Sequence, residues 1–136
     1  MIEKPKKSRA VAREEFDRRG NYNEFLNYCQ AQRNPFFQTM KLKEQNNICL
    51  VCNRQFKEAP QGHHTTYDHL CYTKETVRIK KENSKRIHGR PLPDCEKCFS
   101  EHPNCFKLCA ERIVFLHANC HRYVHGRLPK STDNVR

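Results

Sequence analysis

Leu116-His117-Ala118-Asn119-Cys120-His121-Arg122-Tyr123-Val124-His125, close to the end of the 136-residue chain, is the stretch that decides the fold. Its His117 and Cys120 have the spacing of a zinc knuckle, and a matching pair, Cys49 and Cys52, lies nearer the middle of the chain. Two thiolates from one pair, with an imidazole and a thiolate from the other, complete a tetrahedral Cys3His zinc site. Because protein ligands fill all of its positions, we expect this zinc to be structural.

A second group of candidate metal ligands begins directly after this knuckle. His121 and His125 stand four positions apart, so on a helix they share one face and can bind a metal together. Between the knuckle pairs lies Thr65-Thr66-Tyr67-Asp68-His69-Leu70, a strand-like stretch with an adjacent carboxylate and imidazole. Asp68 can bind a hard divalent cation, and His69 can accept a proton near neutral pH. Neighbours on a regular strand point to opposite faces, so both serve one site only where the strand bends.

The order CxxC, Asp-His, HxxCHxxxH resembles the HNH endonuclease family, most of all the HNH domains of group II intron proteins, over residues 47 to 127. The resemblance implies a ββα-metal unit, in which a two-stranded hairpin and a helix hold one divalent cation against the scissile phosphate. It implies Asp68 and His121 as metal ligands, His125 as a third ligand and His69 as general base. Mg²⁺ or Mn²⁺ is the expected catalytic metal, with Zn²⁺ and Ni²⁺ as alternatives. A shifted register, in which His63 or His64 acts instead, is an open alternative.

The chain departs from the family pattern in two places. Arg112 stands where the family has the asparagine that gives the motif its middle letter, and a long insertion replaces the Gly-Gly turn after Asp68 and His69. In the family this asparagine helps to fix the loop that carries the base, and small misplacements of a catalytic group can cost about 100-fold in rate. Arg112 therefore either weakens catalysis or binds the phosphate itself.

The insertion, at about residues 74 to 110, carries Cys95-x2-Cys98-x6-Cys105-x3-Cys109. These four thiols have the ligand count of a second structural zinc site, in which His102 or Cys71 could replace one cysteine. Such a metal would stiffen a segment that would otherwise be an unusually long structureless loop. We therefore expect a small, zinc-stabilised α+β domain with a second zinc knuckle inserted between the hairpin and the helix.

Local signals place helices before and around these motifs. Residues 1 to 46 read as a basic arm followed by helices from Arg9 to Arg19, from Tyr22 onward after Asn21, and from Pro35 to about Gln45. Cys29 falls on the apolar face of the second helix and is expected to be a buried thiol rather than a ligand. Strands are expected over His63–Tyr72 and Arg112–Leu116, and a helix over Ala118–His125. Residues 128 to 136 read as a polar tail.

The composition indicates a polyanionic partner. The chain has 26 basic and 15 acidic residues, a net charge of +11 and a pI near 9.4. DNA is the first candidate and RNA the second. The basic run inside the insertion is expected to hold the nucleic-acid backbone, although a solvated surface is the plain alternative; the expected contacts are Lys80, Lys81, Lys85, Arg86, Arg90 and Arg112.

Cysteine usage and the lack of long apolar runs indicate the compartment. The nine cysteines occur mostly at metal-ligand spacings, which is typical of a reducing compartment such as the cytoplasm or an organelle interior, and a phage or mobile-element origin fits. No secretory signal or membrane segment is expected. The leading function is a metal-dependent endonuclease, alone, as a homodimer or within a larger assembly. The alternative is a catalytically degenerate, zinc-dependent scaffold that binds DNA or RNA.

Overall fold

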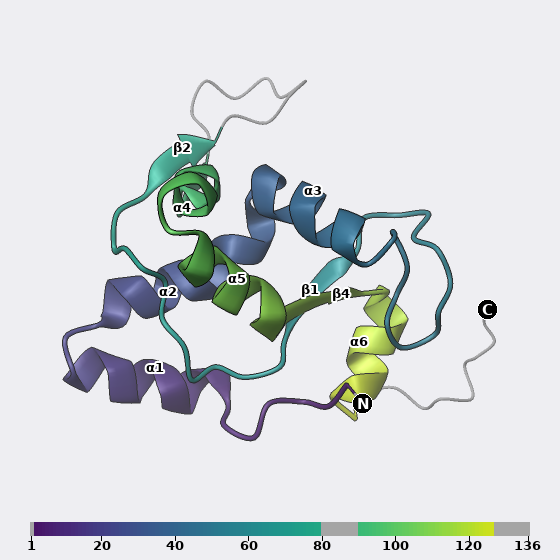
Figure 1. Ribbon diagram of the computed structural model, residues 1–136. Helices are drawn as coiled ribbons and strands as arrows, with labels where there is room; N and C mark the ends of the chain where they lie inside the picture. The colour runs from purple at the N-terminus through teal and green to yellow at the C-terminus, as the bar shows by residue number, and fades with distance from the viewer. Residues whose placement is uncertain (1, 80–89, 127–136) are drawn as a thin grey trace.

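The computed structural model describes residues 2 to 79 and 90 to 126, and their amino-terminal part is helical (Figure 1). Helices α1 (Arg9–Arg18), α2 (Tyr22–Gln30) and α3 (Pro35–Glu44) follow one another, with a 3-10 turn, η1 (Ala31–Arg33), between the last two. The side chain of Asn34 accepts hydrogen bonds from the backbone N–H groups of Phe36 and Phe37, so it caps α3. These bounds confirm the predicted amino-terminal helices. None of the helices in the described residues has the length and apolar character that a membrane span requires.

Two small antiparallel sheets and three further helices complete the fold. Strand β1 (Gln61–His64) pairs with β4 (Ile113–Leu116), so that His63 lies opposite Val114. Strand β2 (Val77–Ile79) pairs with β3 (Arg90–Leu92), and α4 (Cys95–Glu101) and α5 (Pro103–Arg112) follow. Helix α5 leads directly into β4, and α6 (Ala118–Val124) comes one residue after that strand. The chain is therefore a mixed α+β protein, as predicted.

The first strand is shorter than the sequence indicates. It ends at His64 rather than continuing to Tyr72, and Asp68 and His69 lie in the irregular segment that follows. Beyond Thr65 the chain turns to α2, because the hydroxyl of Tyr28 donates to the carbonyl oxygen of Thr66 and the N–H of Cys71 donates to that of Glu24. Arg112, predicted as the first residue of the second strand, is the last residue of α5.

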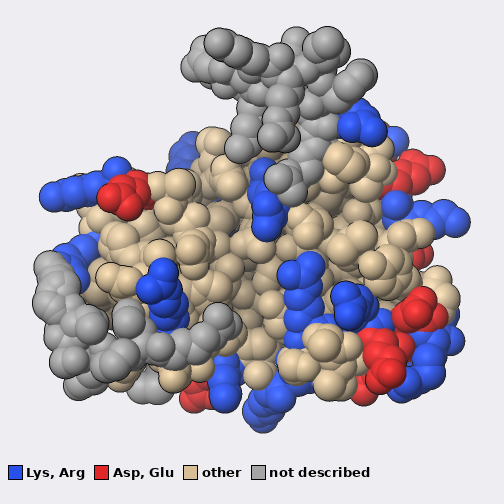
Figure 2. Space-filling model, turned by 180° about the vertical axis from the view of Figure 1, so that it is seen from behind, with Lys and Arg blue, Asp and Glu red and all other residues tan. Residues whose placement is uncertain are grey.

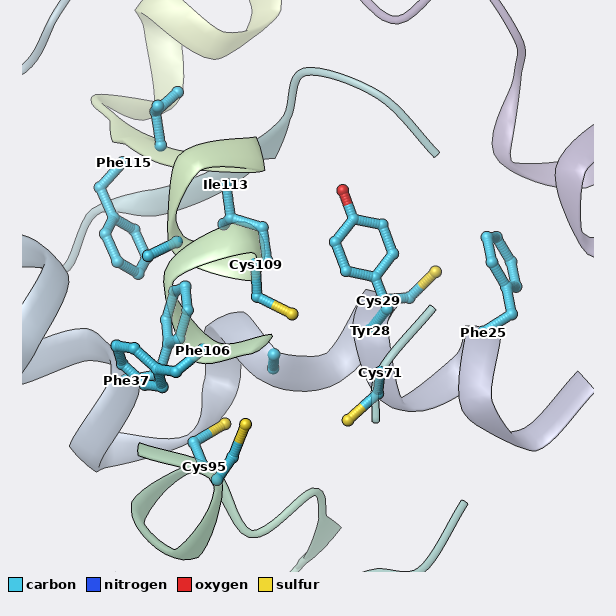
Figure 3. Close-up of a cluster of buried hydrophobic side chains, with 14 of the residues drawn as sticks. Phe25, Tyr28, Cys29, Phe37, Cys71, Cys95, Phe106, Cys109, Ile113 and Phe115 are labelled. Atoms are coloured by element: carbon cyan, nitrogen blue, oxygen red, sulfur yellow. The ribbon is translucent and has the colours of Figure 1, made fainter. Parts of the chain in front are cut away.

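The core lies between the amino-terminal helices and the β4 strand (Figure 3). All residues of β4 are buried, which is why this strand reads as a continuous apolar run rather than an alternating one. Aromatic rings from several elements pack around it, namely Phe25 and Tyr28 of α2, Phe37 of α3 and Phe106 of α5. The core thus fixes β4, and through it the β1 strand and the start of α6.

Gln45 joins the end of α3 to the middle of β4. Its Nε2 donates to the carbonyl oxygen of Phe115 at 3.0 Å, and its Oε1 accepts from the N–H of Phe115 at 2.8 Å. Gln45 is buried. Strand β4 pairs with a strand on one side only, so the buried backbone N–H and C=O groups on its other side need hydrogen-bond partners. One side chain therefore satisfies both polar groups of a buried strand residue.

We predict that Gln45→Met lowers the free energy of unfolding by about 2–4 kcal/mol, because each buried polar group left unpaired costs roughly 1–3 kcal/mol. Urea denaturation of the zinc-loaded protein measures this change. The matched control is Gln38→Met in the same helix, where the side chain makes a half-buried hydrogen bond to the carbonyl oxygen of Gln32. Equal losses for the two variants would contradict a special role for Gln45.

Candidate metal sites

The structure brings together the two predicted knuckle pairs. The ligand atoms of Cys49, Cys52, His117 and Cys120 all lie within 4.8 Å of one another. The first pair sits in a tight turn closed by a bridge between Ile48 and Gln55. The second pair flanks the junction between β4 and the first turn of α6. This arrangement can hold a metal such as zinc.

The ring of His117 is oriented for metal binding. Its Nε2 lies 3.3 Å from the carbonyl oxygen of Gln55, and its Nδ1 lies 3.2 Å from the Sγ of Cys52. When Nε2–H donates to the carbonyl, Nδ1 keeps its lone pair and faces the sulfurs. A hydrogen bond from the second ring nitrogen is the usual way in which proteins orient a histidine ligand.

The charges in this cluster also favour a cation. Burial opposes ionisation of Cys52, but hydrogen bonds from Arg54, and then from the thiols of Cys49 and Cys120, together lower the pKa of this thiol to about 6. Burial, and then the neighbouring Cys49, raise the pKa of Cys120 to about 12. One thiol therefore ionises readily while a second resists, because thiolates repel each other at this distance. Zinc would remove that repulsion and release the remaining protons.

A second cluster consists only of histidines. His63 of β1, His121 of α6 and His125, which caps that helix, place their ligand atoms within 4.8 Å of one another. The four-residue spacing brings the last two to one face of the helix, as predicted. The third member comes from the His63–His64 pair rather than from Asp68. Among the described residues, these two clusters are the groups of three or more ligand atoms that meet so closely.

Hydrogen bonds orient two of these rings toward the cluster. The Nε2 of His63 lies 2.8 Å from the carbonyl oxygen of Glu3, so it carries the proton and donates. The Nδ1 of the same ring is buried and has no hydrogen-bond partner. The Nδ1 of His121 lies 2.9 Å from Oε1 of Gln61, so Nδ1–H donates to this oxygen and orients the ring. Burial also lowers the pKa of His63, so this imidazole stays neutral as a ligand must.

The residues predicted as the catalytic pair lie elsewhere. The Nε2 of His69 is 3.2 Å from the Sγ of Cys109, and its ring packs edge-on against Tyr28. Burial, together with the charge of Arg112, lowers the pKa of His69 to about 4. Asp68 is exposed and is not part of the histidine cluster.

His64 follows the His63 ligand but faces α2. It is 5% exposed, and its ring packs against Tyr28 and stacks on Tyr67. Burial lowers the pKa of His64 to about 4. His64 and His69 are therefore both neutral imidazoles, and they contact the same tyrosine.

Arg112 and the cysteines of the insertion precede β4 in the chain, whereas the two clusters involve α6, which follows this strand. The Nη1 of Arg112 donates to the carbonyl oxygen of Leu108 at 2.9 Å, within its own helix. Cys95, Cys98 and Cys109 are buried, whereas Cys105 is half-buried. These sulfurs are not drawn together as closely as the ligands of the first cluster.

The predicted basic contacts fall largely outside the described residues. The predicted contacts outside the described residues are Lys80, Lys81, Lys85 and Arg86. Arg90 is described only as the first residue of β3. Elsewhere, Figure 2 shows lysine and arginine side chains spread over the middle of one face, with acidic side chains nearer its edges. A hollow beside β1 is lined by the amino-terminal arm and by residues that follow the strand. The lining residues are Glu3, Lys4, Lys6, Lys7, Thr65, Thr66 and Asp68.

The sequence predicts His63 only as an alternative site residue, and it does not indicate that the amino-terminal arm contacts the site. The feature that indicates His63 is the pair His63-His64, which directly follows a Gly-containing loop at the start of a predicted strand. The arm left no such signal. Its link to the site is the hydrogen bond that the His63 ring donates to the backbone carbonyl oxygen of Glu3, 60 residues away in the sequence.

We predict that Cys120→Ser loses one zinc per chain and that chelation of the wild-type protein abolishes its cooperative thermal unfolding. Structural zinc contributes about 10–16 kcal/mol of apparent binding free energy, which matches or exceeds the roughly 5–15 kcal/mol stability of a whole domain. Elemental analysis and circular dichroism measure the two effects. Cys29→Ala, at a buried thiol outside both clusters, should keep the wild-type metal content. A Cys120→Ser protein with unchanged zinc would show that this cluster binds none.

Comparison with known proteins gives no relative for this chain. It matches no protein-family model, no curated protein and no solved structure. The two clusters are therefore interpreted from the chemistry of their own residues.

Proposed function

We propose that the protein is a metal-dependent endonuclease of the HNH type, which hydrolyses phosphodiester bonds in DNA and binds its catalytic metal through His63, His121 and His125. Several features support this assignment. Strands β1 and β4 pair antiparallel and β4 leads into a short helix, as in a ββα-metal unit into which β2, β3, α4 and α5 are inserted between the two strands. Two histidines on the helix and one on the first strand converge, and a Cys3His cluster stands at the start of that helix. Divalent Mg²⁺, Mn²⁺, Ni²⁺ or Zn²⁺ are candidate metals.

One observation carries the proposal: the buried Nδ1 of His63 has no hydrogen-bond partner. A buried polar atom without a partner costs roughly 1–3 kcal/mol, so such atoms call for an explanation. Because Nε2–H donates to Glu3, the unpartnered Nδ1 carries a lone pair, and its neighbours are two further imidazoles. A divalent cation bound there would use this lone pair. Three protein ligands also leave positions open, as catalytic metal sites do.

The chain supplies the other requirements of phosphodiester hydrolysis. A bound divalent cation would polarise the scissile phosphate and stabilise the leaving oxygen. We assign the role of proton acceptor to His64, the last residue of β1, which directly follows the His63 ligand where the chain leaves the strand. Burial lowers its pKa to about 4, so the ring is neutral, and the assignment requires the ring to turn from α2 toward the metal when substrate binds. The assignment of His69 suggested by the family resemblance is less favoured, since its Nε2 faces Cys109. In this assignment, which follows the shifted register, Asp68 is not a metal ligand.

The lysines of the amino-terminal arm support DNA as the substrate. Lys4 and Lys6 are exposed, and they line the hollow beside Thr65 and Thr66, directly after β1. The arm runs past α6 (Figure 1), and its Glu3 carbonyl binds the His63 ring. Exposed lysines next to a metal site can hold the phosphates on either side of the scissile bond, with an affinity that falls as salt rises.

A second candidate is a zinc-dependent scaffold that binds DNA or RNA without cutting it. One observation favours it: both candidate proton acceptors, His64 and His69, pack against Tyr28, and His64 is 5% exposed. A general base must come within hydrogen-bond reach of the water it activates, and apo structures often hold it less well than complexes do. The scaffold and the enzyme share the Cys3His cluster but differ in their need for the three histidines.

We predict that the zinc-loaded protein with added Mn²⁺ or Mg²⁺ cleaves plasmid DNA, and that His125→Ala lowers the rate by at least about 100-fold, because even residues that only support a metal ligand contribute 10–100-fold. Calorimetric titration with Mn²⁺ should show one site lost in the variant. His102→Ala, at an exposed histidine outside the cluster, should leave both measurements unchanged. If wild-type protein binds DNA in a salt-sensitive way but cuts it with none of the metals, the scaffold is correct.

His64→Ala should lower the cleavage rate by about 100-fold or more while it leaves Mn²⁺ affinity unchanged, because general base catalysis contributes about 10²–10⁴-fold. His69→Ala should retain most of the rate. Rates at saturating metal, together with calorimetric affinities, distinguish loss of the proton acceptor from loss of the metal. The reverse result, with the rate lost only in His69→Ala, would return the role of base to His69.

A further inference from the structure

Five cysteines outside the Cys3His cluster gather on one side of the core. Cys95 and Cys98 lie in the first turn of α4, where the side chain of Asp94 caps the helix. Cys105 and Cys109 lie one turn apart on α5. Cys71 comes from the irregular segment after β1, and its N–H donates to the carbonyl oxygen of Glu24. Zinc takes four ligands in a structural site, so one of the five is surplus.

Burial divides the five thiols into four and one. Cys71, Cys95, Cys98 and Cys109 are each exposed by 9% or less, whereas Cys105 is half-buried. Figure 3 shows the sulfurs of Cys71, Cys95 and Cys109 turned toward a common space, while that of Cys29 points away from it. Cys71 lies outside the insertion, so the spacing of the four cysteines within the insertion does not indicate it as a ligand.

We propose that Cys71, Cys95, Cys98 and Cys109 bind a second structural zinc, with Cys105 outside the ligand set. In a tetrahedral site with Zn–S bonds of about 2.3 Å the sulfurs stand roughly 3.8 Å apart, so the four side chains must draw in on binding. His69 then supports the site from outside, because its Nε2–H, 3.2 Å from the Sγ of Cys109, can donate to the thiolate.

The proposed zinc would tie the segment after β1 to the insertion. Cys71 comes shortly after Asp68 and His69. Helices α4 and α5 form the carboxyl-terminal part of the insertion. Without a metal, the only backbone contact described between Cys71 and a named element is the one to Glu24 of α2. A zinc at this point would hold the segment after β1 from a second direction.

Zinc content of paired variants tests the ligand set. Cys71→Ser should contain one zinc fewer per chain than the wild type, and Cys105→Ser should contain the same amount as the wild type. Cys29→Ala serves as the control for loss of a thiol that is not a ligand. Loss of one zinc in Cys105→Ser with retention in Cys71→Ser would overturn the proposal in favour of Cys95, Cys98, Cys105 and Cys109. Full zinc content in both variants would overturn it as well, because Cys71 would then be no ligand.

Alkylation of the wild-type protein provides a second test that needs no folded variant. In the native zinc-loaded protein, iodoacetamide should modify Cys105 and leave Cys71 protected, as read by peptide mass spectrometry. A strong zinc chelator should make Cys71 reactive. Rapid modification of Cys71 in the zinc-loaded protein would overturn the proposal. Neither test measures DNA cleavage, so the proposed zinc and the proposed nuclease activity stand or fall separately.

Discussion

The meeting of residues 49 to 52 with residues 117 to 120 in the Cys3His cluster is the constraint on which the rest of the structure depends. Helix α6 has seven residues and none of them is buried, so hydrophobic burial contributes little to its position. An isolated helix of that length is unstable in water. What holds α6 is the buried β4 strand before it and the ligands His117 and Cys120 at its start. The positions of His121 and His125 therefore depend on the Cys3His cluster.

Local signals in the sequence predict the parts of the fold that local chemistry controls. The cap at Asn34, the proline that follows it and the apolar spacing of α2 each act within one or two turns, and the structure has the corresponding helices. The Cys3His set is also predictable, because two pairs at knuckle spacing supply one complete set of zinc ligands. In the first case the deciding residues lie next to each other, and in the second two pairs of ligands at the same spacing together supply the four ligands that zinc takes.

The end of β1 could not be predicted in this way, because distant contacts decide it. From His63 to Tyr72 the residues are suited to a strand throughout. The chain nevertheless turns away after His64, since Tyr28 and Glu24 of α2 offer hydrogen bonds to Thr66 and Cys71. That turn removes Asp68 from the strand and leaves His63 as the histidine opposite α6. A pair of residues that looks catalytic in sequence is thus displaced by contacts that no local pattern records.

Helix α6 carries candidate ligands of both clusters, so the position of one cluster depends on the position of the other. Cys120 belongs to the Cys3His cluster, and its neighbour His121 belongs to the histidine cluster. Consecutive residues on a helix point about 100° apart, so the helix presents one cluster to the knuckle and the other to β1. Because the knuckle fixes the rotation of the helix, it also fixes the direction in which His121 and His125 point. A zinc bound in the Cys3His cluster would therefore also position two of the three histidines, and the metal that would stabilise the fold would be separate from the metal that would react.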